Sequence, residues 1–403
     1  MDGPRAGRGV IAAVARLLES ARADGIAPAL AAAVLRDGAL VHASWHGVVP
    51  GPGGASPRPL REDDLFDVAS LTKVMATTTL AAQLVAAGAL DLDAPVAPRL
   101  PGFEAGGKER VTARHLLAHA AGFPAWRPYC ERVAADPVAG RAFLPPASRP
   151  RGAALAEAFA QGRALVRAAV LAEPLEAPPG ARALYCDPGF IALGLLVEAI
   201  AGEGLAPLAE ARVLRPLGLG ATLFLDGSAP AEAAARAAGR TFAPTGRSTR
   251  RGEVVQGTVN DDNAYAMGGV AGHAGLFSTP LDVAALGQAW LEAALGRGSG
   301  AVPADAAREF VRRDRTPASE RALGWDTPSR GASSLGERLG RGPRGAVGHL
   351  GFTGTSLWID LDAGVVCALL TNHVHPSGAP DKPRIRELRR RFHDAVAEGL
   401  GIG

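Results

Sequence analysis

The sequence predicts an α+β fold: an antiparallel sheet flanked by helices and formed by both chain ends, with an inserted mainly helical domain. Near the N-terminus, apolar runs at 29–35 and 39–45 enclose an Asp-Gly pair, which is a strong signal for a β-hairpin. Near the C-terminus, runs at 355–359 and 365–371 enclose a second turn rich in Asp and Gly. The chain between the two hairpins reads mostly as helices and loops, so we expect the hairpins to share one sheet.

The other elements follow from apolar spacing and from residues that start or stop helices. An amphipathic helix is expected from residue 10 through residue 18, and a glycine stops the helix predicted at 71–87. A threonine suited to the N-cap begins a short helix at 112–119. Further helices are expected at 190–200 and 384–400, and long Pro- and Gly-rich loops at 50–59, 124–150 and 227–251.

The chain has 403 residues, which is enough for more than one domain. We predict a sheet domain made of residues 1–66 and 282–403 and a mainly helical domain of residues 67–281. The active site is expected at the interface between the two domains.

The charge balance argues against a nucleic-acid partner. The 43 basic and 40 acidic residues give a net charge of +3, spread along the chain. The basic run Leu388-Arg389-Arg390-Arg391 falls in the C-terminal helical pattern, and we interpret it as a solvated helix face. The sequence therefore contains no cluster of basic residues that predicts nucleic-acid binding.

The cysteines and the apolar stretches indicate the compartment. Cys130, Cys186 and Cys367 are odd in number and far apart, which fits a reducing environment rather than a disulfide framework. The apolar stretch near the N-terminus stops after about six residues, whereas a signal peptide has roughly 7–15. The uncharged stretches 38–57 and 263–281 contain histidine and several glycines, so neither is a membrane span. We expect a cytoplasmic protein.

The first candidate catalytic motif is Ser70-Leu71-Thr72-Lys73, at the start of a predicted helix. A spacing of three places Ser70 and Lys73 one turn apart on the same face. A neighbouring base activates a serine hydroxyl, and a lysine can be that base when burial lowers its pKa towards neutrality. Only three of the 43 basic residues are lysines, and arginine cannot give up its proton, so a lysine here suggests a required deprotonation. By itself, the motif could also be a serine N-cap followed by a surface lysine.

The second motif is Tyr185-Cys186-Asp187, just before the helix predicted at 190–200. A phenol near a lysine ammonium can act as a base or relay a proton to a leaving group. Taken alone, Tyr185 could equally be a tyrosine packed beside the Pro-Gly turn that follows it.

The third motif is His349-Leu350-Gly351, followed by Phe352 and a predicted strand. The glycine would allow a substrate to lie along the strand edge, facing backbone N–H groups. As a lone pattern it could be any strand entry bracketed by glycines.

In order and spacing, the three motifs resemble those of the family of class C β-lactamases, DD-peptidases and related esterases. That family has Ser-x-x-Lys on a helix, then Tyr-x-Asn, then Lys/His-Thr-Gly on a late strand. The segments 66–69, 111–124 and 272–279 are also similar to the family, and the likeness extends over roughly residues 28 to 375. The resemblance implies a β-lactamase/transpeptidase-like fold and an acyl-enzyme reaction without metal or cofactor.

The resemblance also implies roles for individual residues. Ser70 would be the acylated nucleophile, Lys73 its partner base, and Tyr185 the second proton carrier, which activates the deacylating water. The backbone N–H groups of Ser70 and Phe352 would form the oxyanion hole. Asp187, His349 and Gly351 would contact the substrate.

Two positions depart from the pattern of the lactamases. Asp187 stands where they have asparagine, and an ionised carboxylate cannot donate to a substrate carbonyl, although it could hold Lys73 or Tyr185. His349 stands where they have lysine, so its charge is expected to depend on pH. Both changes predict poor β-lactam hydrolysis and favour an ester or peptide-like substrate.

Other signals carry less weight. Asn263 and His273 are expected either to border the pocket or to anchor loops. His115 and His119 have the spacing of a zinc pair, but Leu116 stands where a zinc protease needs glutamate, so no metal is expected. The absence of GxSxG argues against an α/β-hydrolase.

Together these observations predict a hydrolase that cleaves an ester or amide of a small-molecule or peptide-like substrate through acyl-Ser70. Two alternatives stay open at this stage. One is acyl transfer from the same intermediate, and the other is a non-catalytic ligand-binding relative of the fold.

Overall fold

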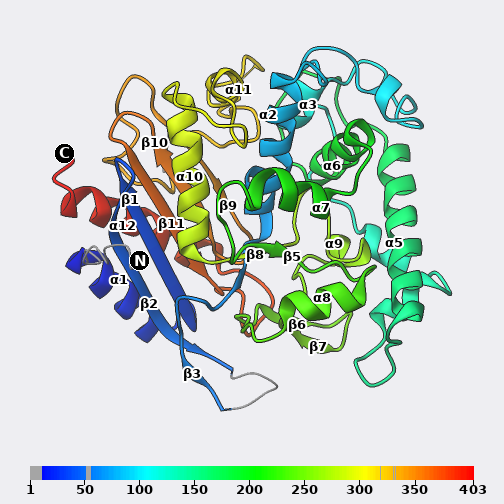
Figure 1. Cartoon of the computed structure of the whole chain (residues 1–403), viewed down its shortest axis with the longest axis horizontal. Helices are drawn as coiled ribbons and strands as arrows, with labels where there is room; N and C mark the ends of the chain where they lie inside the picture. Colours follow the sequence, from blue (N-terminus) through cyan, green and yellow to red (C-terminus); the bar gives the residue numbers. More distant parts are fainter. Residues whose placement is uncertain (1–10, 51–55, 318, 330, 332) are drawn as a thin grey trace.

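The computed structural model describes residues 11–50, 56–317, 319–329, 331 and 333–403. Within these residues, the main sheet has six antiparallel strands in the order β3-β2-β1-β11-β10-β9 (Figure 1). Its strands are β1 (Ala29–Arg36), β2 (Ala39–Val49), β3 (Arg58–Pro59), β9 (Ala346–Leu350), β10 (Ser356–Asp360) and β11 (Val365–Thr371). The smaller strands are β4 (Phe66–Asp67), β5 (Leu223–Phe224), β6 (Gly246–Ser248), β7 (Glu253–Val255) and β8 (Leu276–Ser278).

The two chain ends meet at the centre of the main sheet. Strand β1 pairs with β11, with Leu30 opposite Thr371, and the backbone N–H of Ala29 donates to the side chain of Asn372. Both predicted hairpins are confirmed, and so is the α+β class with a sheet formed by both chain ends.

The alternation of side chains along β1 explains why helices cover both faces of the sheet. Leu30 and alternate residues after it pack with α1 (Ala12–Ala23) and α12 (Lys382–Gly399). The residues between them face a larger core that includes α10 (Pro280–Ala294). A Cβ at Gly287 of α10 would lie 2.6 Å from Val366, so glycine permits the close approach of this helix to the sheet.

The helical part lies beside the β9 edge of the sheet (Figure 1). Its longer helices are α2 (Thr79–Ala86), α5 (Ala153–Ala172), α6 (Asp187–Ala201) and α8 (Pro230–Ala237). Its short helices are α3 (Ala113–Leu117), α4 (Tyr129–Ala134), α7 (Leu205–Ala209) and α9 (Asp262–Ala266); α11 (Ala304–Phe310) follows α10. Single turns are η2 (Ala69–Leu71), η3 (Lys73–Thr78), η4 (Ala97–Arg99), η5 (Ala139–Phe143) and η6 (Glu210–Leu214). The domain boundaries at 66–67 and 281–282 stay a prediction.

Two stretches expected to be loops contain regular structure. Residues 124–150 hold α4 and η5, because Val133 and Phe143 are apolar anchors buried in the core. Residues 227–251 hold α8 and the strand β6, which pairs with β7. The helix predicted at 71–87 is present, but η3 winds as a wider π-helical turn before α2 continues.

Within the described residues, no single helix is long and apolar enough to cross a membrane. Helix α6 and the stretch Leu205–Leu214 reach that length and composition only as a pair, bent by 76°.

Candidate active site

Ser70 lies in η2, directly after the short strand β4. The residue before it, Ala69, has φ +49°, a left-handed conformation that is strained for alanine. The carboxylate of Asp67 accepts from the Ala69 N–H at 2.8 Å and holds this conformation. The serine is thereby presented at the start of a helical segment, where N–H groups lack intrahelical acceptors.

Lys73 is completely buried one turn beyond Ser70. Its Nζ donates to Ser70 Oγ at 3.0 Å, to Asp187 Oδ1 at 2.8 Å and to the carbonyl oxygen of His273 at 3.2 Å. Burial alone would lower the pKa of Lys73. The carboxylate of Asp187 raises it, and the pKa is higher than usual overall. Asp187 therefore favours the ammonium form of Lys73, whereas the role of partner base that the resemblance implies needs the neutral amine; that role stays a prediction.

Tyr185 lies between the two other motifs. Lys73 Nζ is 5.0 Å from the centre of its ring, and the ring of His349 is 5.9 Å away. The pKa of Tyr185 is raised overall, because burial and the charge of Asp187 outweigh the opposing effects of Lys73 and of hydrogen bonding with Ser70. The structure therefore brings the alcohol, the amine and the phenol together, as predicted.

Arg321 is a site residue that the sequence analysis missed. Its guanidinium lies 5.1 Å from the centre of the Tyr185 ring and is paired with Asp326. Tyr185 therefore has cations from two different elements close to it, Lys73 and Arg321. Arg321 belongs to no motif, since it reaches the site from the loop between α11 and β9.

His349 is buried on β9, with 1% of its surface exposed. Burial and the charges of Lys73 and Arg321 hold its pKa well below the usual value. The imidazole is therefore neutral at physiological pH, with Nδ1 placed 2.9 Å from the carbonyl oxygen of Leu350. The nearby cations and the buried surroundings disfavour protonation, so the expected dependence of its charge on pH is moved to pH values well below the usual range of histidine.

The turn after β9 is fastened to the segment that precedes Ser70. Thr353 Oγ1 donates to the carbonyl of Asp67 at 2.8 Å, and Thr355 Oγ1 donates to that of Val68 at 3.1 Å. In the described part of the chain, the N–H of Phe352 has no hydrogen-bond acceptor. The hydrogen bonds of Thr353 and Thr355 therefore fix the position of the Phe352 segment relative to the Ser70 segment.

These groups open onto a cavity of about 1260 Å³. Trp126 and Phe352, 48% and 49% exposed, give it two apolar walls. The predicted site residues on its wall are Ser70, Tyr185, Asp187, His273, His349, Gly351 and Phe352.

His273 borders the cavity, whereas Asn263 is not among the residues that line it. His273 lines the cavity and its Nε2 lies 2.9 Å from Asp261. Asn263 is buried, and its amide accepts from Cys130 N–H and donates to the Arg127 carbonyl. Asn263 thus ties two segments of backbone together and anchors a loop.

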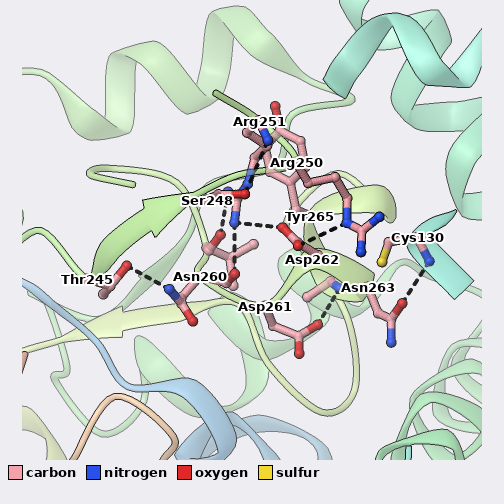
Figure 2. A network of polar contacts seen from close by, with 12 residues as sticks. Cys130, Thr245, Ser248, Arg250, Arg251, Asn260, Asp261, Asp262, Asn263 and Tyr265 are labelled. Atoms are coloured by element: carbon pink, nitrogen blue, oxygen red, sulfur yellow. Dashed lines mark hydrogen bonds and ion pairs between the residues drawn. The ribbon is translucent and has the colours of Figure 1, made fainter. Parts of the chain in front are cut away.

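Figure 2 shows a polar network that includes Asn260, Asp262 and Asn263. Of these residues, Asn260 and Asp262 line the cavity. Arg251 is fully buried, donates to the carbonyls of Val259 and Asn260, and pairs with Asp262 at 3.0 Å. Arg250 pairs with the same carboxylate at 3.3 Å and lines the cavity. This network fixes the segment that follows β7.

The two histidines with zinc-like spacing make structural hydrogen bonds instead. His115 Nδ1 accepts from the N–H of Thr112 in a capping box, and His119 Nδ1 accepts from the N–H of Cys186. In the ranges that the structure describes, no group of three His, Cys, Asp or Glu side chains is arranged to hold a metal.

Comparison with known proteins agrees with this geometry. The family model described as Beta-lactamase matches residues 14–390. A protein of Escherichia coli K12 named "Putative D-alanyl-D-alanine carboxypeptidase" is 32% identical over 343 residues, covering 79% of this chain and 71% of that protein. A protein of the same name from Escherichia coli O157:H7 is 31% identical over 390 residues, covering 90% and 82%.

Solved structures share the fold at lower identity. EstCE1, described as a hydrolase with promiscuous acyltransferase activity, has a TM-score of 0.68 at 19% identity, covering 96% of this chain and 98% of that one. The octameric penicillin-binding protein homologue from Pyrococcus abyssi has a TM-score of 0.66 at 21% identity, covering 98% and 78%. With the family match over most of its length, the chain belongs to the beta-lactamase family of serine hydrolases.

Proposed function

We propose that this protein hydrolyses a carboxylic ester or a D-amino-acid peptide through a covalent intermediate on Ser70. The observation that supports this most strongly is the contact of buried Lys73 Nζ with Ser70 Oγ and Asp187, with Tyr185 alongside. Ser70, Tyr185 and Asp187 line one cavity. The relatives named as carboxypeptidases favour a small peptide-like substrate. We also propose that it acts in the cytoplasm, as its three free thiols suggest.

In acylation, Ser70 Oγ forms a bond to the substrate carbonyl carbon, and its proton passes to Tyr185 in the phenolate form. Lys73 remains an ammonium held by Asp187 and stabilises that phenolate. The tetrahedral oxyanion is stabilised by the N–H groups of Ser70 and Phe352, at about 3 kcal/mol per donor. The bond to the leaving group then breaks, and Tyr185 returns the proton to the departing oxygen or nitrogen.

Deacylation repeats these steps with water. Tyr185 takes a proton from the water, the hydroxyl adds to the acyl carbon, and Ser70 leaves with the proton that Tyr185 returns. The products are a carboxylic acid and the free serine.

The test is labelling with a fluorophosphonate, followed by peptide mass mapping and a panel of p-nitrophenyl esters, D-amino-acid dipeptides and nitrocefin. We expect a label on Ser70, turnover of at least one ester or dipeptide, and loss of about 10⁴-fold or more in Ser70→Ala. Folded protein that neither labels at Ser70 nor turns over any of these compounds would contradict the proposal and would favour a ligand-binding relative.

A further inference from the structure

Arg389 of α12 is a buried arginine that the sequence analysis placed on a solvated face. Only 7% of its surface is exposed. It lies four residues after Ile385 and three before Phe392, which are both buried on the same helix. That spacing puts Arg389 on the apolar stripe. The interpretation of 388–391 as a solvated face is therefore wrong for Leu388 and Arg389, which are both buried.

The contacts of Arg389 lead to the turn that carries Phe352. Its Nη2 donates to the carbonyl of Gly351 at 2.8 Å and to that of Thr355 at 2.8 Å. The N–H of Gly351 donates to the same Thr355 carbonyl, so the guanidinium closes the turn. Both ends of this turn are therefore fixed by a single charged group.

Arg389 forms no ion pair in the described part of the chain. Among the residues that the structure describes, no carboxylate lies within ion-pair distance of it, and its Nε is buried without a partner. Burial lowers the pKa of Arg389 to about 10, so the guanidinium is still charged at neutral pH. An unpaired buried cation is unfavourable for folding, which indicates that its charge serves another purpose.

The carbonyl of Gly351 and the N–H of Phe352 are the two ends of one peptide group. A charge-assisted hydrogen bond to the carbonyl withdraws electron density and makes the N–H a stronger donor. The carbonyl also accepts from Gly354 N–H at 3.1 Å, so the plane of the peptide is held from two directions. The influence of the charge extends into the site, since Arg389 contributes to the lowered pKa of His349.

We propose that Arg389 is a positioning residue that orients and polarises the Gly351–Phe352 peptide, so that the Phe352 N–H stabilises the oxyanion formed when Ser70 attacks. This inference rests on the proposed function. Arg389 acts through the peptide bond, and its effect is specific to states in which negative charge develops on the substrate oxygen.

The experiment compares wild type, Arg389→Met and Arg389→Lys after acylation with a slowly released ester whose carbonyl carbon is ¹³C. The infrared band of the acyl carbonyl reports how strongly the oxyanion hole polarises it. We expect the band to move to higher wavenumber in Arg389→Met, with kcat lower by about 10- to 100-fold and KM nearly unchanged. Arg389→Lys keeps the charge and should recover most of the rate.

The matched control is Arg390→Met, which removes the same charge one residue later from a side chain paired with Glu387 and Asp394. Its band and rate should equal those of wild type. If Arg389→Met does not fold, Arg389→Gln, which keeps an N–H donor without the charge, should show the same shift of the band.

Three outcomes would overturn the inference. One is an unshifted band in a folded neutral variant, and another is the same shift in Arg390→Met. The third is an effect confined to KM for anionic esters, which would show direct substrate binding. Failure of wild type to become acylated at Ser70 would instead contradict the proposed function, so the two failures are distinguishable.

Discussion

The ammonium of Lys73 and the carboxylate of Asp187 lie 2.8 Å apart, and the ammonium also contacts the Ser70 hydroxyl. The negative charge of Asp187 raises the pKa of both Lys73 and Tyr185. In the proposed mechanism, Tyr185 must lose its proton before it can accept the proton of Ser70. The ion pair is therefore expected to influence the pH at which the active form becomes populated.

Asp187→Asn should move the ascending limb of the pH profile of kcat/KM to lower pH, by about one to three units. Without the carboxylate, both pKa values fall, and the form with one proton fewer appears at lower pH. The measurement is ester hydrolysis from pH 5 to 10, with thermal unfolding to verify folding. A limb that stays in place or moves to higher pH would contradict the assignment of Asp187.

Arg321→Gln should have the opposite effect. The guanidinium beside the Tyr185 ring favours the phenolate, so its loss raises the pKa of Tyr185 and moves the limb up by as much as about one unit. On that limb, one unit corresponds to about a tenfold lower rate at neutral pH. Arg312→Gln, a change on a side chain that is 70% exposed, is the control and should leave the profile unchanged.

Gly351→Ala should damage both stability and catalysis. A Cβ there would lie 2.0 Å from Thr355 Oγ1 and 2.7 Å from the Val68 carbonyl, so two fixed segments would have to separate. We expect a loss of about 1–3 kcal/mol in the free energy of unfolding and a fall of about 100-fold in kcat. Gly220→Ala, where a Cβ meets nothing within 4 Å, should be nearly neutral in urea unfolding and in ester assays.

Nitrocefin should be a poor substrate. Neutral His349 offers no cation for the carboxylate of a β-lactam, and Asp187 cannot donate a hydrogen bond as an asparagine would. We expect stoichiometric acyl-enzyme in the mass spectrum and kcat at least about 100-fold below that of the best ester. Fast steady-state turnover of nitrocefin would show that these two departures do not limit the reaction.

The order and spacing of the sequence motifs predicted the centre of the site, because Ser70, Lys73 and Tyr185 each belong to a recognisable local pattern. Arg321 could not be found in this way, since a loop brings it to Tyr185 only in the folded chain. Arg389 could have been found, because its spacing from Ile385 and Phe392 marks the buried stripe. The protonation state of Lys73 depended on its distance from Asp187, which sequence does not contain.

The pairing of β1 with β11 has a consequence for the synthesis of this enzyme on the ribosome. The N–H of Ala29 reaches its acceptor on Asn372 across 343 positions. The first hairpin must therefore wait, with an unpaired strand edge, until β11 has been synthesised. Because β9 and its turn also follow Ser70 by more than half of the sequence, a nascent chain would carry the proposed nucleophile long before the proposed oxyanion hole.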